Sequence, residues 1–377
     1  MSSRVLAIIR KETREVLRDP IYLGLAIAVP LVVMTLLAEG FVIDVKNLPV
    51  AFVDQDRSPF SREYVSAFTN SEYFRLVALG DDMAQAERML QAARVRAIVV
   101  IPPDFSRTLN AGKRAAVQVL VDGSFAGRAL IVTGYIAAID AQFSASVLAN
   151  YLARRGLSAT SLAPVAVDGR VWFNPSLEAK NGTVPGLLVI SLMFYPGLLA
   201  ALVVVREKER GTIFNLYCAP VSRWEVVVGK AVPYIGLAFV DYFLLFAMSV
   251  WLFDVRFVGS FFVLTVAALL YICCCVGLGL VISVFSRTQV AAMLLTFIGL
   301  MTPSMMFSGM MSPIASMDRS AQAISRVIPA SYFMGMARGV FLKGLGLRYY
   351  LSDFASLGAF AAVVFTIAIL AFRKRVA

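Results

Sequence analysis

Six long apolar segments constrain the fold of this 377-residue chain more than any other feature. A helix needs about 20 mainly apolar residues to cross the hydrocarbon core of a bilayer. Inside that core every backbone polar group must be bonded within the protein, and a helix achieves this. The sequence therefore predicts an α-helical membrane protein with six transmembrane helices, and its 59% share of hydrophobic residues agrees. The six segments are Ile21–Phe41, Thr183–Val205, Ala231–Phe253, Val258–Phe285, Val290–Met311 and Asp353–Phe372.

The first apolar segment follows a basic N-terminal stretch, as the apolar part of a cleaved signal peptide also does. It is longer than the 7–15 residues or so of a signal-peptide apolar region, and no small-x-small cleavage site follows Leu36-Leu37-Ala38-Glu39. We therefore expect a retained transmembrane helix over residues 21–43, preceded by a cytoplasmic helix over residues 1–20.

The positions of the basic residues set the predicted orientation. The net charge is +11, and cytoplasmic loops of membrane proteins carry an excess of Lys and Arg. Basic residues gather before the first apolar segment, after the second and at the C-terminus. Both termini are therefore predicted to be cytoplasmic, although residues 312–352 place further basic residues outside. We assign the positive charge to contact with the lipid bilayer and expect no nucleic-acid partner.

Residues 44–181 have the pattern of a folded domain inserted between the first and second transmembrane helices. Strand-length apolar runs alternate with segments of helical period, which favours a mixed α/β domain around one sheet. The orientation places this domain outside the cytoplasm. The expected strands are 48–53, 73–78, 97–101 and 116–121, and the expected helices are 58–68, 83–93, a short one from Asp104, and 127–155.

Residues 182–377 are predicted to form a five-helix transmembrane region with a cytoplasmic loop over residues 206–230. Within it, the external segment 312–352 is too polar to span a bilayer and too apolar for a free loop. Proline and glycine residues interrupt it. Short re-entrant or interfacial helices packed against protein suit such a composition.

The sequence offers little material for catalysis. It has no histidine, which is the commonest general base and metal ligand. The adjacent residues Cys273–Cys275 point about 100° apart on a helix and cannot converge on one ion. Neither Gly112-Lys113 nor Gly229-Lys230 lies in a Gly-x-x-x-x-Gly-Lys-Ser/Thr phosphate-binding motif. We assign no catalytic, cofactor-binding or metal-binding residue to this chain, so ATP-driven work would need ATP and Mg²⁺ bound by a partner.

Two cytoplasmic segments suit contact with such a partner. Residues 10–20 form a charged amphipathic helix pattern that ends in proline, and an interfacial anchor held by anionic lipid would have the same pattern. Residues 206–225 combine mixed charge, an apolar centre and a proline stop. An apolar loop of this kind favours docking to another protein, but a simple intracellular loop remains the alternative.

Both segments resemble those of ABC-2 type transporter permeases, in the drug-efflux-like branch with a large extracytoplasmic domain. Lys11-Glu12 with Arg18-Asp19-Pro20 is similar to the elbow helix of that family. The stretch Arg206–Thr212, with Pro220-Val221-Ser222 and Gly229-Lys230 after it, is similar to the coupling-helix loop.

A third match, Leu48–Pro59, is similar to the opening of the external domain in that branch, so the resemblance covers nearly the whole chain. It implies a bacterial inner-membrane half-transporter whose coupling helix sits in a cleft of a separate ATP-binding subunit. By this resemblance, ATPase coupling is assigned to Glu207, Glu209, Gly211, Thr212, Pro220 and Ser222, and bracing by the elbow helix to Lys11, Glu12, Arg18, Asp19 and Pro20.

A translocation path is a further prediction. Asp241 is a carboxylate well inside an apolar segment, where an acid either handles substrate or protons or forms a structural hydrogen bond. Flexible methionines and aromatic residues could line an adaptable path, but such residues also pack membrane helices generally. The candidate path residues are Asp241, Phe297, Met305, Met306 and Phe307.

The predicted function is a permease that exports an amphipathic small molecule or lipid-like compound from the cytoplasm or inner leaflet. It would form a homodimer or a heterodimer with a second permease, bound to ATPase subunits. The resemblance also raises a periplasmic adaptor and an outer-membrane channel as partners. The alternatives are a membrane-anchored envelope sensor or assembly scaffold without transport, and a secondary transporter, which would need midplane charges and repeated halves.

Overall fold

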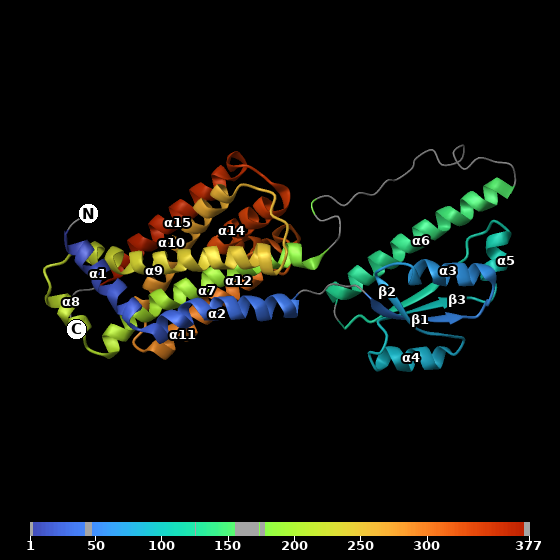
Figure 1. Cartoon of the computed structure of the whole chain (residues 1–377), viewed down its shortest axis with the longest axis horizontal. Helices are drawn as coiled ribbons and strands as arrows, with labels where there is room; N and C mark the ends of the chain where they lie inside the picture. Colours follow the sequence, from blue (N-terminus) through green and yellow to red (C-terminus); the bar gives the residue numbers. More distant parts are fainter. Residues whose placement is uncertain (1–2, 42–46, 125, 155–172, 174–177, 373–377) are drawn as a thin grey trace. The chain divides into compact units, whose positions relative to one another are not determined.

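The computed structural model describes residues 3–41, 47–124, 126–154, 173 and 178–372 (Figure 1). The chain divides into two compact units. The helical unit contains residues 1–42 and 171–377, and the α/β unit contains residues 43–170. Each unit has its own hydrophobic core.

The helical unit consists of long helices joined by short turns. A π-helical turn, Met248–Leu252, extends α9, and a second one, Phe297–Met301, joins α11 to α12. Its helices are α1 (Ser3–Arg18), α2 (Pro20–Phe41), α7 (Ala179–Glu209), α8 (Ile213–Cys218), α9 (Arg223–Ala247), α10 (Phe261–Phe285), α11 (Gln289–Thr296), α12 (Thr302–Phe307), α13 (Arg319–Ser325), α14 (Pro329–Arg338) and α15 (Leu351–Ala371).

Helix α1 is the predicted elbow helix. It is amphipathic and buries one face, which includes Ile8 and Glu12. Pro20 is the first residue of α2. Proline has no backbone N–H, and this costs nothing there because N–H groups in the first turn of a helix have no acceptor within the helix. Asp19 accepts a hydrogen bond from the backbone N–H of Tyr22 at 3.0 Å. The chain therefore turns sharply between α1 and α2.

Helix α7 is the central element of the helical unit. It packs against α2, α9, α10, α11 and α14, and 72% of its most apolar stretch is buried. It approaches α10 closely where Gly197 faces Gly279. A methyl group on Gly279 would lie 2.1 Å from the carbonyl oxygen of Gly197. Only glycine fits there. Small residues let the backbones of membrane helices approach closely.

The segment 312–352 forms short helices, as its composition predicts, and packs onto the helical unit. Helix α14 contacts α7, α10 and α15. The side chain of Arg338 donates hydrogen bonds to the carbonyl oxygens of Gly182, Gly309 and Met310, at 3.0, 2.7 and 3.0 Å. This arginine therefore joins the end of α14 to the start of α7 and to the turn after α12.

The α/β unit is built on a four-stranded sheet of order β2-β1-β3-β4. Strand β1 is parallel to β2 and β3, and β4 is antiparallel to β3. Helices α3 and α6 cover one face and α4 the other (Figure 1). The elements are β1 (Leu48–Asp54), α3 (Pro59–Thr69), β2 (Phe74–Gly80), α4 (Met83–Gln91), β3 (Ala97–Ile101), α5 (Phe105–Asn110), β4 (Gln118–Val121) and α6 (Ala126–Arg154).

The expected strands and helices of this unit are present, with boundaries shifted by a few residues at most. The predicted span 290–311 differs, because its α-helix is interrupted by the π-helical turn and ends at Phe307. Pro303 stands in the first turn of α12 and cannot donate the hydrogen bond that a continuous α-helix needs. A π-helical turn before it accommodates that loss.

Seven helical segments in the described part of the chain are long and apolar enough to cross a membrane. Six coincide with the predicted spans, and the seventh, Ile131–Ala153, lies in α6. One face of α6 is buried in the core of the α/β unit through Val132, Ile136, Ile139 and Phe143. The packing of α6 against its own unit therefore accounts for apolar residues on that face.

Substituting Gly279→Ala should destabilise the helical unit. The added methyl group cannot fit against Gly197, and overpacking costs about 1–3 kcal/mol. The matched control is Gly358→Ala in α15, where a methyl group would meet open space and gain roughly 1 kcal/mol of helix propensity. In thermal melts of the detergent-solubilised protein, we expect a lower midpoint for Gly279→Ala and an unchanged or higher one for Gly358→Ala. Equal midpoints would contradict the tight contact.

Candidate functional site

The C-terminal end of α7 gathers the charged residues that the sequence assigns to coupling. Three consecutive residues there bind three different parts of the helical unit. Glu207 faces α1 and α9, Lys208 the end of α10, and Glu209 the start of α11. Because consecutive side chains on a helix diverge by about 100°, one helical turn can hold several neighbours at once.

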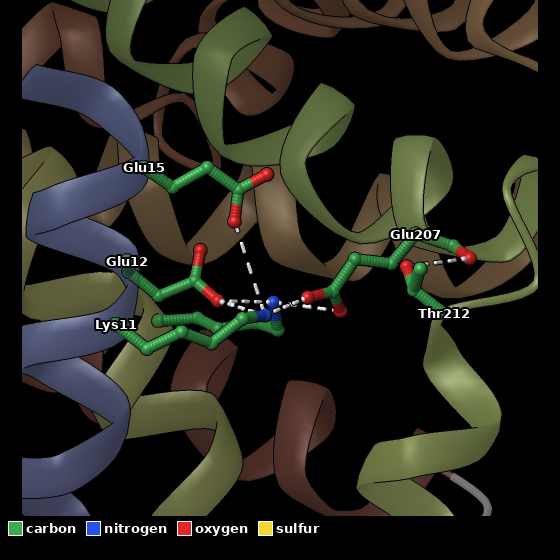
Figure 2. A network of polar contacts seen from close by, with 6 residues as sticks. Lys11, Glu12, Glu15, Glu207 and Thr212 are labelled. Atoms are coloured by element: carbon green, nitrogen blue, oxygen red, sulfur yellow. Dashed lines mark hydrogen bonds and ion pairs between the residues drawn. The ribbon is translucent and has the colours of Figure 1, made fainter. Parts of the chain in front are cut away.

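Glu207 belongs to a buried cluster that we call the ion-pair cluster, made of Lys11, Glu12, Glu207 and Lys230 (Figure 2). The ammonium group of Lys230 lies 2.8 Å from Glu12 Oε1 and 2.8 Å from Glu207 Oε2. Lys11 bonds to Glu207 Oε1 and lies 3.2 Å from Glu12 Oε1. The cluster therefore joins α1, α7 and α9.

Burial makes this cluster sensitive to the loss of Glu12, Glu207 or Lys230, whereas the side chain of Lys11 is 52% exposed. The side chains of Lys230 and Glu12 are 1% exposed, and that of Glu207 is 9% exposed. A charge in such surroundings is stable only with a partner, because desolvation costs several kcal/mol per ion. The approach of α1 to α9 that brings the charges together depends on Gly229, since a methyl group there would lie 2.7 Å from Ile8.

The protonation state of Lys11 follows from the same contacts. Partial burial acts to lower the pKa of Lys11, but the hydrogen bond to Glu207 and the negative charges of Glu12 and Glu207 outweigh it. The pKa of Lys11 is therefore raised above its ordinary value. Any stability gained from this raised pKa is present below the ordinary value and is lost only as the pH rises through the raised one. Lys11 is thus charged throughout the physiological range.

The next two residues of α7 hold helix ends. Lys208 Nζ donates hydrogen bonds to the carbonyl oxygens of Ser283, Val284 and Ser286, at 2.6, 2.9 and 3.1 Å. These carbonyl groups lie at the C-terminal end of α10, where a cation is favoured by the helix dipole. Glu209 accepts a hydrogen bond from the backbone N–H of Gln289 at 2.8 Å, at the N-terminus of α11. Negative charge is favoured at that end.

The predicted coupling loop continues directly from this end of α7. Gly211 has φ of 71°, a left-handed conformation that glycine adopts at little cost. Thr212 precedes the short helix α8, which ends before Pro220. Ser222 starts α9, and its backbone N–H donates to Glu225 Oε2 at 2.8 Å. The loop is therefore a compact turn–helix–turn between two long helices.

Two large aromatic residues lie on the exposed surface of this loop. Phe214 in α8 is 50% exposed, and Trp224 at the start of α9 is 47% exposed. Ile213, next to Phe214, is 4% exposed and anchors α8 to the core. Exposed aromatic side chains on an anchored helix are typical of protein-binding surfaces.

The elbow residues divide between two environments. Lys11 and Glu12 enter the ion-pair cluster, whereas Arg18 is exposed. Asp19 lies 3.6 Å from Arg206 of α7, and Pro20 opens α2. The structure thus connects α1 and the turn after it to the last turns of α7 in two places.

The candidate path residues are not gathered in one place. Asp241 is 2% exposed in α9, and in the described part of the chain neither of its carboxylate oxygens has a hydrogen-bond partner. Phe297 and Met306 lie on the exposed surface of the α11–α12 segment, where Met305 and Phe307 are half-buried. Asp241 therefore lies in the helical core and the other four line a different surface.

Sequence reasoning assigns no role to Lys230, Lys208 or Gln289. Lys230 stands at the border of a predicted apolar span, and an ionisable residue in that position is a signal for a buried partner. The partner itself, Glu12, is 218 positions away in the chain and no local pattern identifies it. Among the described residues, no group of three His, Cys, Asp or Glu side chains could hold a metal ion.

The comparisons with known proteins agree on one family. The model of the family described as "ABC-2 family transporter protein" matches residues 20–370. From Escherichia coli K12, "Probable multidrug ABC transporter permease YbhS" is 31% identical over 343 residues, covering 90% of this chain and 89% of the relative. "Probable multidrug ABC transporter permease YbhR" is 27% identical over 376 residues, 100% of both chains. "Inner membrane transport permease YhhJ" is 28% identical over 334 residues, 87% of this chain and 86% of the relative.

Removing the central cation of the ion-pair cluster should destabilise the helical unit strongly. Lys230→Met leaves the carboxylates of Glu12 and Glu207 buried without the Lys230 ammonium group. Breaking a buried ion pair costs about 3–5 kcal/mol. Lys180→Met is the matched control, because the pair of Lys180 and Glu178 is only partly buried, and pairs that water still reaches contribute less than buried ones, roughly 1 kcal/mol or below.

Thermal melts of the two purified variants check this prediction. We expect a large drop in midpoint for Lys230→Met and a small one for Lys180→Met. The triple variant Glu12→Gln, Glu207→Gln, Lys230→Met should recover part of the loss, because it removes the two buried carboxylates together with Lys230, and the Lys11 charge that remains is 52% exposed. Equal midpoints for the two single variants would refute the role given to Lys230.

Proposed function

This chain belongs to the ABC-2 family of transporter proteins and is a multi-pass membrane permease, and from that premise we propose that it serves an ATP-driven exporter. In this proposal, a separate ATP-binding subunit hydrolyses ATP with Mg²⁺, and this chain forms the pathway. Its substrate is an amphipathic small molecule or lipid-like compound, moved out of the cytoplasm or inner leaflet. The names of the two full-length or nearly full-length relatives, both multidrug permeases, support that substrate class.

The proposed topology has six transmembrane crossings in the bacterial inner membrane, with both termini cytoplasmic. The concentration of basic residues in α1 and after α7 supports this orientation. Helix α6 is not counted as a crossing, because one of its faces is buried in the core of the α/β unit. Residues 44–181 then lie outside, and would provide the docking surface for a periplasmic adaptor and an outer-membrane channel where these take part.

The observation that carries the proposal is the exposed aromatic surface of the coupling loop, next to the end of α7. Phe214 and Trp224 offer apolar contact area to a partner. Docking of the ATP-binding subunit would cover it. A push on α8 would then reach α7 through the short turn at Gly211, because three residues separate Glu209 from α8.

The last turn of α7 would pass that movement to the rest of the helical unit. Glu207 holds α1 and α9, Lys208 holds α10, and Glu209 holds α11. Gly211, Thr212, Pro220 and Ser222 would shape the loop that receives the push. Two permeases, identical or similar, would then move together and alternate the pathway between inward and outward exposure.

Purification of the tagged chain from native membranes tests the partner directly. Mass spectrometry should find a stoichiometric polypeptide with a phosphate-binding loop, and the complex should hydrolyse ATP. A chain that purifies alone, or with envelope proteins that lack ATPase activity, would favour the sensor or scaffold alternative.

Removing the exposed aromatic side chains should separate the two subunits. The double variant Phe214→Ala, Trp224→Ala loses two large apolar contacts, and truncation of such residues commonly costs about 2 kcal/mol or more each at an interface. We expect the amount of co-purified ATPase to fall at least tenfold. Trp251→Ala is the control, because Trp251 is 84% exposed but lies at the opposite end of α9. A control that loses as much ATPase as the double variant would contradict docking at α8.

A further inference from the structure

An apolar cavity opens beside the ion-pair cluster. It has a volume of about 550 Å³, which is within the range of about 300–1,000 Å³ typical of ligand sites. Its walls come from α1, α2, α7, α9 and α11, and its apolar lining residues include Leu25, Val29, Leu198, Leu202 and Met293. We call it the apolar chamber.

A second cavity of about 690 Å³ lies between α1 and the end of α7. Six cationic side chains line it against two carboxylates, Glu15 and Asp19. We call it the basic chamber. The cations are Arg10, Lys11, Arg14, Arg18, Arg206 and Arg210.

The two chambers adjoin. Glu15, Arg206 and Arg210 line both of them. Tyr22 lies at this border, with the guanidinium of Arg206 5.8 Å from the centre of its ring. Aromatic residues with basic neighbours mark the interface between hydrocarbon and water in membrane proteins. The joined space therefore runs from apolar walls to a cationic mouth at that interface.

The positive charge of the basic chamber is only partly neutralised by the protein. Lys11 is bound to Glu207, and Arg206 lies 3.6 Å from Asp19. Four of the arginines have no carboxylate at ion-pair distance within the described part of the chain: Arg10, Arg14, Arg18 and Arg210. Like charges gathered around one opening repel each other, and a bound anion would relieve that repulsion.

We propose that the joined chambers bind an anionic phospholipid of the cytoplasmic leaflet. The phosphate group lies among Arg14, Arg18 and Arg210, where it neutralises these guanidinium groups with charge-assisted hydrogen bonds. One acyl chain lies in the apolar chamber along α2 and α7. This inference does not depend on the direction or substrate of transport.

A free phosphate ion fits the structure less well, because it would leave the apolar chamber unused. A second copy of this chain also fits less well. In a two-fold interface the same patch meets itself, so the arginines of one copy would face those of the other. A phospholipid is complementary to both chambers at once, and anionic lipids are attracted to basic residues at the cytoplasmic surface.

The test uses the transporter complex in nanodiscs that contain phosphatidylglycerol and phosphatidylcholine in equal amounts. After release into detergent, native mass spectrometry counts the lipids retained on each complex. We expect retention of phosphatidylglycerol over phosphatidylcholine on the wild type. In titrations with phosphatidylglycerol, Arg14→Gln, Arg210→Gln should weaken binding by about tenfold or more, since each basic residue near a membrane surface contributes a several-fold factor.

Two variants and one competitor complete the design. Arg319→Gln, Arg348→Gln removes the same charge from exposed positions outside both chambers and should leave retention unchanged. Leu202→Trp fills the apolar chamber and should weaken phosphatidylglycerol binding without altering charge. Inorganic phosphate should fail to displace the lipid. The proposal is overturned by equal retention of the two lipids, by wild-type retention in the Arg14→Gln, Arg210→Gln variant, or by full displacement with inorganic phosphate.

Discussion

The end of the helical unit at which α1, α7 and α9 meet depends on a buried ammonium group. Lys230 lies 2.8 Å from a carboxylate of α1 and 2.8 Å from a carboxylate of α7, and its side chain is 1% exposed. A buried charge needs a partner of opposite charge, because desolvation costs several kcal/mol per ion, and Lys230 is such a partner for both carboxylates. Three helices from distant parts of the chain are thereby fixed against one another, next to the loop that would receive a partner.

Glu207 and Glu209, to which the family resemblance assigns ATPase coupling, both contact other residues of this chain. Both side chains are bound within this chain, to lysines of α1 and α9 and to Gln289 of α11. The surface left for a partner is formed by Phe214 and Trp224. The exposed aromatic residues and the bound carboxylates thus lie in adjacent segments, which the glycine turn at Gly211 joins.

Much of the architecture can be read from local sequence patterns, because span length and strand alternation are local properties. The strand Ala97–Ile101 begins and ends where the pattern predicts. The contacts that assemble the site are not local: Glu12 and Lys230 are 218 positions apart, and the fit of Gly279 against Gly197 depends on how α7 and α10 pack. Hydropathy alone does not separate α6 from the other long apolar helices, since a buried face against a sheet and a face against lipid have the same composition.

A buried ion-pair cluster is an inefficient way to stabilise a helix junction, since well-packed apolar residues of similar volume are often as good or better. Its value lies in geometry. Apolar side chains can slide past one another, whereas Lys230 must stay within bonding distance of both carboxylates, so α1, α7 and α9 either move together or break the cluster. In the proposed transporter, such a junction would pass a displacement of the coupling loop on to all three helices. Replacing Glu12, Glu207 and Lys230 with apolar residues of similar volume would therefore keep the fold, and in the proposed transporter it would lose the transmission.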